Sequence, residues 1–277
     1  MTTAFVNNVK TAVLLAVLLG LFIGVAGMIN QAFLLPALLI GGVMNVFAYF
    51  FSDTIAIKAM RGRAVDAENG GDLYRMVDDL RRRADLPMPK VYICPQDAPN
   101  AFATGRDPEH SAVTVTEGAL RLLDYHELEG VMAHELAHVK NRDTLTSTIA
   151  ATVAGVLAFI AQWGLLFGAA GQRSNPFVAF IGIILAAVGA AVVRAMISRS
   201  REYAADADGA AIAGNPMGLV SALQKLDSVS RRIPMQQPNP AQNNLFIVEP
   251  LMGSKGLTNL FATHPPVQKR VAKLMAA

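Results

Sequence analysis

The sequence is poor in charge and nearly free of cysteine. Only 16% of its 277 residues are charged, compared with about 25% in average soluble proteins. The single cysteine, Cys94, has no second cysteine to pair with, which excludes an intramolecular disulfide. The formal net charge is only +3, which is too small an excess to indicate nucleic-acid binding. Residues 253–256 (GSKG) lack the spacing of a phosphate-binding loop, so no nucleotide is expected as a ligand.

Hydrophobic residues make up 53% of the chain and are gathered into long runs. A helix needs roughly 20 apolar residues to cross a bilayer. Four stretches meet this requirement without an acidic residue: 11–29, 32–51, 145–170 and 177–197. We therefore predict a polytopic membrane protein with four transmembrane helices. Two alternatives stay open: the first run can be a cleaved signal peptide, and the last two, rich in Ala and Gly, can re-enter the membrane without crossing it.

The basic residues predict the orientation of these helices. If all four cross, 23 of the 24 Lys and Arg residues lie on one side of the membrane and only Arg173 lies on the other. The positive-inside rule then puts both termini and both polar segments in the cytoplasm. The predicted division is a transmembrane hairpin at 1–51, a polar segment at 52–144, a second hairpin at 145–197 and a polar segment at 198–277. Together the two polar segments are long enough for one globular domain.

Local patterns predict that this polar domain is mainly helical with a small β-sheet, an α+β fold. Strands are expected at 90–94 and at 111–116, where polar and apolar residues alternate. Asp124 and Glu127 have the spacing of a capping box, which predicts a helix over 125–142. Further helices are expected at 72–84, from 117 onward and at 199–213, and a loop is expected at 233–256.

Residues 134–138 read His-Glu-Leu-Ala-His inside the predicted helix 125–142. Two histidines four residues apart, His134 and His138, project from the same helix face and can bind one zinc ion. Glu135, beside the first histidine, is then placed to accept a proton from a water that the zinc polarises. This arrangement is the one needed to attack a peptide carbonyl, so the motif predicts a zinc peptidase.

A catalytic zinc needs a third protein ligand, for which glutamate is the better candidate. His110 and His126 are better interpreted as exposed residues of a polar turn and of a first helical turn. Glu202 and Asp206 are four residues apart in the helix expected at 199–213, so that one can bind zinc while the other hydrogen-bonds a ligand histidine. From the residues alone, an exposed acidic face paired with neighbouring arginines is an equally good interpretation, and the two roles can be exchanged.

Motifs spread over most of the chain carry a family resemblance. They are the apolar N-terminal hairpin, NAFATG at 100–105, VTVTEG at 113–118, HELAH at 134–138, REY at 201–203 with Ala205 and Asp206, and FATHPP at 261–266 with Arg270. In these motifs the sequence resembles the HtpX-type membrane zinc metalloproteases, which are gluzincins related to the prenyl-protein (CAAX) endoproteases. The resemblance implies that Glu202 is the third ligand of a single zinc ion.

The resemblance also implies a place and a task. The expected fold is a zincin-like protease domain on the cytoplasmic face of a bacterial inner membrane. The expected activity is the degradation of misfolded or damaged membrane proteins, as part of protein quality control and the stress response. Two other functions stay open. One is a processing protease of the prenyl-endoprotease type with a narrower pocket, and the other is a membrane scaffold with a structural zinc ion, although such an ion normally has four protein ligands.

Two expectations concern the substrate and the transition state. An extended peptide can add to the edge of a strand, main chain to main chain, which would give broad specificity. The candidate strand contains Ala112, Val113, Thr114 and Val115, for which pairing within the domain is an equally good interpretation. A developing oxyanion needs a hydrogen-bond donor, and the chemically able side chains are His264, Arg270, Tyr203 and Asn100. His264 ranks first only because it lies in the family motif.

Overall fold

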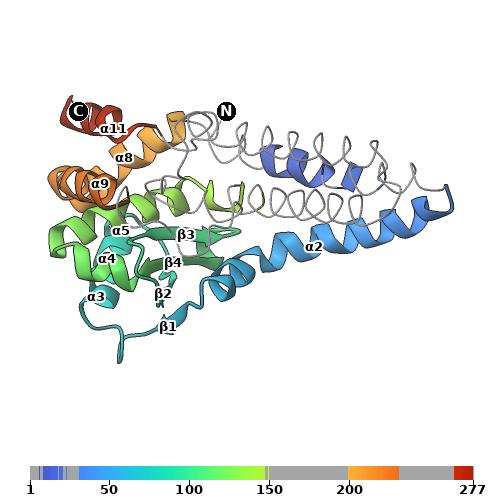
Figure 1. Cartoon of the computed structure of the whole chain (residues 1–277), viewed down its shortest axis with the longest axis horizontal. Helices are drawn as coiled ribbons and strands as arrows, with labels where there is room; N and C mark the ends of the chain where they lie inside the picture. Colours follow the sequence, from blue (N-terminus) through green and yellow to red (C-terminus); the bar gives the residue numbers. More distant parts are fainter. Residues whose placement is uncertain are drawn as a thin grey trace, which may run out of the picture.

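The structure is a computed structural model that describes residues 6, 9–17, 19–20, 23, 31–146, 149, 199–230 and 265–276. In these residues the chain is mainly helical with one small mixed sheet, which confirms the predicted α+β composition. The helices are α2 (Leu34–Ala59), α3 (Gly71–Arg83), α4 (Glu117–Leu122), α5 (Tyr125–Lys140), α8 (Arg199–Ala213), α9 (Met217–Ser230) and α11 (Val267–Ala276), with 3-10 turns at Gln31–Phe33 and Pro108–His110. Figure 1 labels the main elements.

The sheet has four strands in the order β1-β2-β4-β3. The strands are β1 (Arg63–Val65), β2 (Lys90–Cys94), β3 (Ala101–Gly105) and β4 (Ser111–Thr116). β2 and β4 have the predicted bounds and pair with each other in parallel. β1 and β3 were not predicted. β1 pairs antiparallel with β2, and β3 pairs antiparallel with β4. β1 has only three residues, and β3 is rich in small residues, so neither has the β-branched composition that identifies a strand.

The position of β4 corrects one prediction. β4 contains Ala112 to Val115 and pairs with β2 on one side and with β3 on the other. It is therefore a central strand and offers no edge to a peptide substrate. Its six residues are all buried, which agrees with a strand that is covered on both faces. The strand that ends the sheet on this side is β3.

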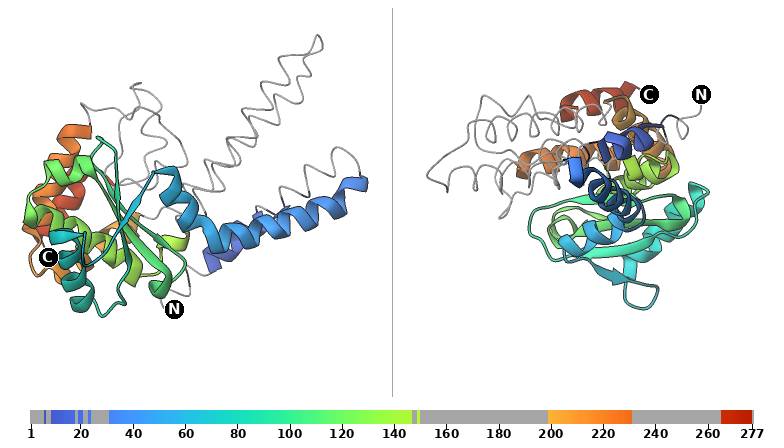
Figure 2. Two further views of the ribbon diagram at one scale, coloured as in Figure 1. Left: turned by 90° about the horizontal axis from the view of Figure 1, so that it is seen from below. Right: turned by 90° about the vertical axis from the view of Figure 1, so that its right-hand side faces the viewer.

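Helix α5 lies between the sheet and the pair formed by α8 and α9 (Figures 1 and 2). It contacts β3, α3, α8 and α9, and most of its residues are buried, including the polar His134 and Glu135. A helix that is buried on nearly every side lacks the one-sided apolar stripe of a surface helix. The C-terminal helix α11 packs on α8 and α9 from the outside.

Local contacts explain where α5 begins and ends. The predicted capping box is confirmed, because the Asp124 side chain accepts from the Glu127 N–H and the Glu127 side chain accepts from the Asp124 N–H. Lys225 of α9 donates to Glu127 at 2.6 Å, which ties the helix start to α9. The helix ends at Lys140, two residues before the predicted end, because Arg142 has a left-handed backbone with φ 55°.

Helix α2 extends away from the domain (Figures 1 and 2) and carries exposed apolar side chains. Leu39 and Val43, for example, are 62% and 69% exposed. Among the described residues no single helix has both the length and the apolar character to cross a membrane, but Leu38–Phe51 and Asp53–Ala59, bent by 72°, have them as a pair. The predicted span 177–197 and the loop 233–256 lie outside the described residues, and so do nine of the 19 residues of the span 11–29 and all of the span 145–170 except 145, 146 and 149.

Two glycines let α5 and α9 approach closely. A Cβ atom at Gly130 of α5 would lie 2.4 Å from the backbone nitrogen of Leu219, and one at Gly218 of α9 would lie 2.2 Å from the carbonyl oxygen of His126. Backbone atoms cannot move aside as the end of a flexible side chain can. The distance between α5 and α9 therefore depends on both residues.

We expect Gly130→Ala to destabilise the protein by about 1–3 kcal/mol, because the added methyl group overpacks a backbone contact. The melting temperature of the detergent-solubilised protein should fall by on the order of 5 °C. Gly42→Ala is the matched control, since a Cβ at this position in α2 meets nothing within 4 Å. Equal melting temperatures for the two variants would show that α5 and α9 can separate without cost.

Candidate active site

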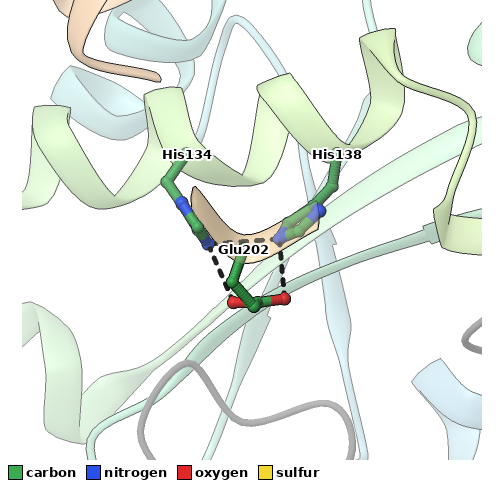
Figure 3. Close-up of side chains that lie close together, drawn as sticks. All are labelled: His134, His138 and Glu202. Atoms are coloured by element: carbon green, nitrogen blue, oxygen red, sulfur yellow. Dashed lines mark hydrogen bonds and ion pairs between the residues drawn. The ribbon is translucent and has the colours of Figure 1, made fainter. Parts of the chain in front are cut away.

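Helices α5 and α8 bring three side chains with metal-binding atoms together (Figure 3). The Nε2 atoms of His134 and His138 lie 3.1 Å apart. Glu202, 64 residues further along the chain on α8, has one carboxylate oxygen 3.9 Å from His134 Nε2 and the other 3.8 Å from His138 Nε2. The facing ligand atoms all lie within 4.8 Å of one another. The sequence prediction that Glu202 accompanies the two histidines agrees with this geometry.

The three residues fit a small divalent cation. Ligand atoms around a tetrahedral zinc ion lie about 3.3 Å apart, which is close to the three distances between these groups. His134 and Glu202 are 1% and 6% exposed, so little water competes for their lone pairs. Burial disfavours a protonated His138, but the carboxylates of Asp143, Glu202 and Glu135 outweigh it and raise the pKa of His138 to about 10. The same negative field would stabilise a metal cation.

Glu135 lies on the helix turn that joins the two histidines and is 5% exposed. Burial raises the pKa of its carboxyl group above the ordinary value, and the adjacent His134 and His138 oppose this shift. The backbone N–H of Ala103 in β3 donates a hydrogen bond to the carboxylate. The helix therefore aims Glu135 at β3.

Asp206 lies one turn after Glu202 on α8 and contacts His134. Its Oδ1 atom is 3.1 Å from His134 Nδ1, the ring nitrogen that faces away from the metal-binding group. Arg270 of α11 donates two hydrogen bonds to the Asp206 carboxylate, from Nη2 at 2.6 Å and from Nε at 2.9 Å. Burial opposes ionisation of Asp206, but the hydrogen bonds from Arg270 and His134 outweigh it and lower its pKa to about 2.

Asp143 contacts the second histidine and was not predicted from the sequence. Its two carboxylate oxygens lie 3.0 and 3.1 Å from His138 Nδ1, and the residue is 3% exposed. The available signal was an aspartate five residues after His138, immediately behind the end of the helix. Residues five apart do not contact each other in an ideal helix. The contact forms because the chain turns back at the left-handed residue Arg142.

Comparisons with known proteins identify the family. The sequence profile of peptidase family M48 matches residues 67–277. The chain belongs to peptidase family M48. Two relatives are each called "Protease HtpX homolog". The one from Pelotomaculum thermopropionicum is 50% identical, over 98% of this chain and 99% of the relative. The one from Desulforapulum autotrophicum is 49% identical, over 97% of this chain and 89% of the relative. The protein is therefore an HtpX-type metalloprotease.

A solved structure shares the fold of this M48 peptidase. A structure titled "Crystal Structure of S. mikatae Ste24p" superimposes with a TM-score of 0.51 at 19% sequence identity. The superposition covers 99% of this chain and 66% of that chain. At this identity the likeness concerns the fold, which agrees with a mainly helical protein built around a small sheet.

The remaining predicted site residues of the M48 peptidase have different positions. Arg270 is fully buried, and its Nη2 atom lies 3.3 Å from His134 Nε2. The Tyr203 ring packs under Lys273 of α11, with Nζ 3.9 Å from its centroid. The Asn100 N–H donates to Thr116 Oγ1 at 2.8 Å, which fixes the start of β3. His264 lies outside the described residues.

Two other histidines were interpreted as surface residues, and their exposure confirms it. The His110 side chain is 53% exposed and its Nδ1 atom lies 2.7 Å from Asp107 Oδ1. The His126 side chain is 84% exposed. Neither belongs to the metal-binding group, which leaves His134, His138 and Glu202 as that group among the described residues.

We expect Arg270→Met to destabilise the M48 peptidase by about 3 kcal/mol, because it leaves the buried Asp206 carboxylate without its charged partner. Thermal unfolding of the detergent-solubilised protein measures the effect. The double variant Asp206→Asn with Arg270→Met should be more stable than the sum of the single changes predicts. Lys269→Met, an exposed neighbour on α11, is the control. Additive effects of the two changes would mean that the pair is not coupled.

Proposed function

We propose that the protein is a zinc-dependent endopeptidase of a bacterial inner membrane with a cytoplasmic active site. Its proposed substrates are misfolded or damaged membrane proteins, whose peptide bonds it hydrolyses in protein quality control under stress. The observation that carries the proposal is the meeting of His134, His138 and Glu202 from two helices, with Glu135 beside them. Family membership supports the reaction type.

The donor set favours zinc and a catalytic rather than a structural role. Two imidazole nitrogens and a carboxylate are ligands that zinc accepts, and three protein ligands leave one position open for water or substrate. When bound, zinc would supply Lewis acidity for the attack of water on a peptide carbonyl. His134 and His138 would hold it through Nε2, because their Nδ1 atoms face Asp206 and Asp143.

Glu135 is the proposed general base. Its carboxylate would take a proton from the attacking water and deliver it to the nitrogen of the leaving amine. The Ala103 N–H donates to this carboxylate and holds it near β3. A substrate that lies along β3 would therefore lie close to Glu135. Asp206 and Arg270 would act indirectly, through the orientation of His134.

Strand β3 is the proposed docking strand for the substrate. In an antiparallel pair, successive residues turn their main-chain groups alternately toward the partner strand and away from it. Contacts of the Ala103 N–H with Glu135 and of the Gly105 carbonyl with Thr144 mark the groups that turn away from β4. The Ala103 N–H and the Gly105 carbonyl are already bonded, so a substrate would pair with other main-chain groups along this side of β3. Pairing of that kind recognises a peptide with little regard to its side chains.

The exposed apolar surface of α2 supports the membrane location. Long apolar side chains surround the helix rather than forming one stripe, as is typical of a helix in lipid. The largest exposed fractions belong to Leu35, Leu39, Ile40, Val43 and Val46. The distribution of Lys and Arg along the chain supports cytoplasmic termini.

Glu135→Gln tests the reaction. We expect the detergent-purified variant to retain stoichiometric zinc, because Glu135 is not a proposed ligand, and to cleave an unfolded model protein at least 100-fold more slowly than the wild type. Zinc content and cleavage are measured on both proteins. If both retain zinc and neither cleaves unfolded or membrane-protein substrates, a processing protease with a narrow specificity becomes the better interpretation.

The orientation has its own test. Single cysteines introduced as Arg173→Cys and Lys255→Cys in a Cys94→Ser background are labelled with a membrane-impermeant thiol reagent from outside intact cells. We expect labelling at position 173 alone, since the positive-inside rule puts position 255 in the cytoplasm. Labelling at position 255 but not at 173 would reverse the proposed topology.

A further inference from the structure

The chain leaves α5 through a turn that returns at once to the second histidine. The N–H of Arg142 donates to the carbonyl of Val139 at 3.1 Å, and the N–H of Asp143 donates to the carbonyl of His138 at 3.3 Å. These two bonds, together with the left-handed conformation of Arg142, form a Schellman motif. Asp143 is thereby bonded through its own backbone to the residue that its side chain also contacts.

The left-handed residue of this turn is not a glycine. Glycine is the common choice at this position, because a Cβ atom disfavours the left-handed conformation. Here the residue is Arg142 with φ 55° and an exposed side chain. The ends of α2 and α3 have the same turn, with Arg61 at φ 56° and Asp85 at φ 57° as the left-handed residues. The importance of the turn after α5 therefore comes from the side chain that it carries to His138, that of Asp143.

The Asp143 side chain meets the rear of the His138 ring. Both carboxylate oxygens lie within 3.1 Å of Nδ1, so the ring donates its Nδ1 proton to the carboxylate. This tautomer leaves the Nε2 lone pair directed at His134 and Glu202, where a metal ion would lie. A carboxylate behind a ligand imidazole also makes the ring a stronger electron donor.

We propose that Asp143 is a positioning residue for the metal site and that the left-handed turn at Arg142 is the device that delivers it. The proposal rests on the proposed function, because it takes His138 as a metal ligand. Each ligand histidine then has a carboxylate behind it: Asp206 from α8 orients His134, and Asp143 from the turn orients His138. The two aspartates come from different parts of the chain.

The adjacent residue links the same turn to the sheet. Thr144 Oγ1 donates to the Gly105 carbonyl at the end of β3, at 3.0 Å. Thr144 is 5% exposed, as deeply buried as Asp143, but this bond reaches the strand and not a ligand histidine. Thr144 therefore provides a matched control at the neighbouring position.

The experiment measures zinc affinity by competition with a chelator on the full-length protein in detergent. We expect Asp143→Ala to bind zinc 10–100-fold more weakly, the usual effect of removing the partner of a ligand histidine. Asp143→Asn keeps an oxygen that can accept from Nδ1 and should recover part of the loss. Thr144→Val should keep wild-type affinity. The visible spectrum of the Co²⁺-substituted protein should change in Asp143→Ala and not in Thr144→Val.

Wild-type zinc affinity and an unchanged cobalt spectrum in Asp143→Ala would overturn the proposal while leaving the proposed function intact. An equal loss in Asp143→Asn and Asp143→Ala, with a matching fall in the melting temperature of the metal-free protein, would make the role purely structural and would also overturn it. Failure of the wild type to bind zinc would overturn the proposed function, and this inference with it.

The turn is tested at Arg142. Arg142→Gly suits the left-handed conformation and should keep wild-type zinc affinity. Arg142→Val, whose branched side chain disfavours this conformation, should weaken zinc binding severalfold, although the Arg142 side chain is exposed and Asp143 is unchanged. Equal affinities in the two variants would show that the turn does not control the position of Asp143.

Discussion

Burial of α5 is the constraint on which the rest of the structure depends. The helix carries two histidines and a glutamate into the interior, where an unpaired polar group loses its hydration without compensation. Partners from separate parts of the chain provide that compensation. Asp206 comes from α8, Asp143 from the turn after α5, and the Ala103 N–H from β3. Each of these elements brings a polar group close to a buried polar atom of α5.

The close packing of α5 and the chemistry of the site have the same origin. Glycines at the contact with α9 allow backbones to touch, and the capping box joined to Lys225 holds the beginning of the helix on α9. With the helix held along its length, the facing nitrogens of its two histidines stay 3.1 Å apart. A metal site needs this preorganisation, since ligands displaced by much less than a bond length lose affinity and geometry.

Arg270 illustrates how a residue that the sequence identifies can have a partner that the sequence does not predict. Its charge made it a candidate to stabilise the transition state. In the structure it is fully buried and donates two hydrogen bonds to the Asp206 carboxylate. Its role in the transition state stays a prediction. The C-terminal helix α11 is joined in this way to the metal site, more than 60 residues from Glu202 along the chain.

Short-range physics was readable from the sequence. The spacing of His134 and His138, the capping box at Asp124 and the bounds of β2 and β4 depend on neighbours within a few residues, and the structure agrees with each of them. Tertiary structure alone decided that β4 is central, because its second partner β3 has no strand-like composition. It also decided that Asp143 reaches His138, because the contact requires a left-handed Arg142 that an isolated sequence disfavours. Strand pairing between distant residues and left-handed turns at non-glycine residues are stabilised by the packed fold as a whole. Local sequence patterns therefore do not predict them.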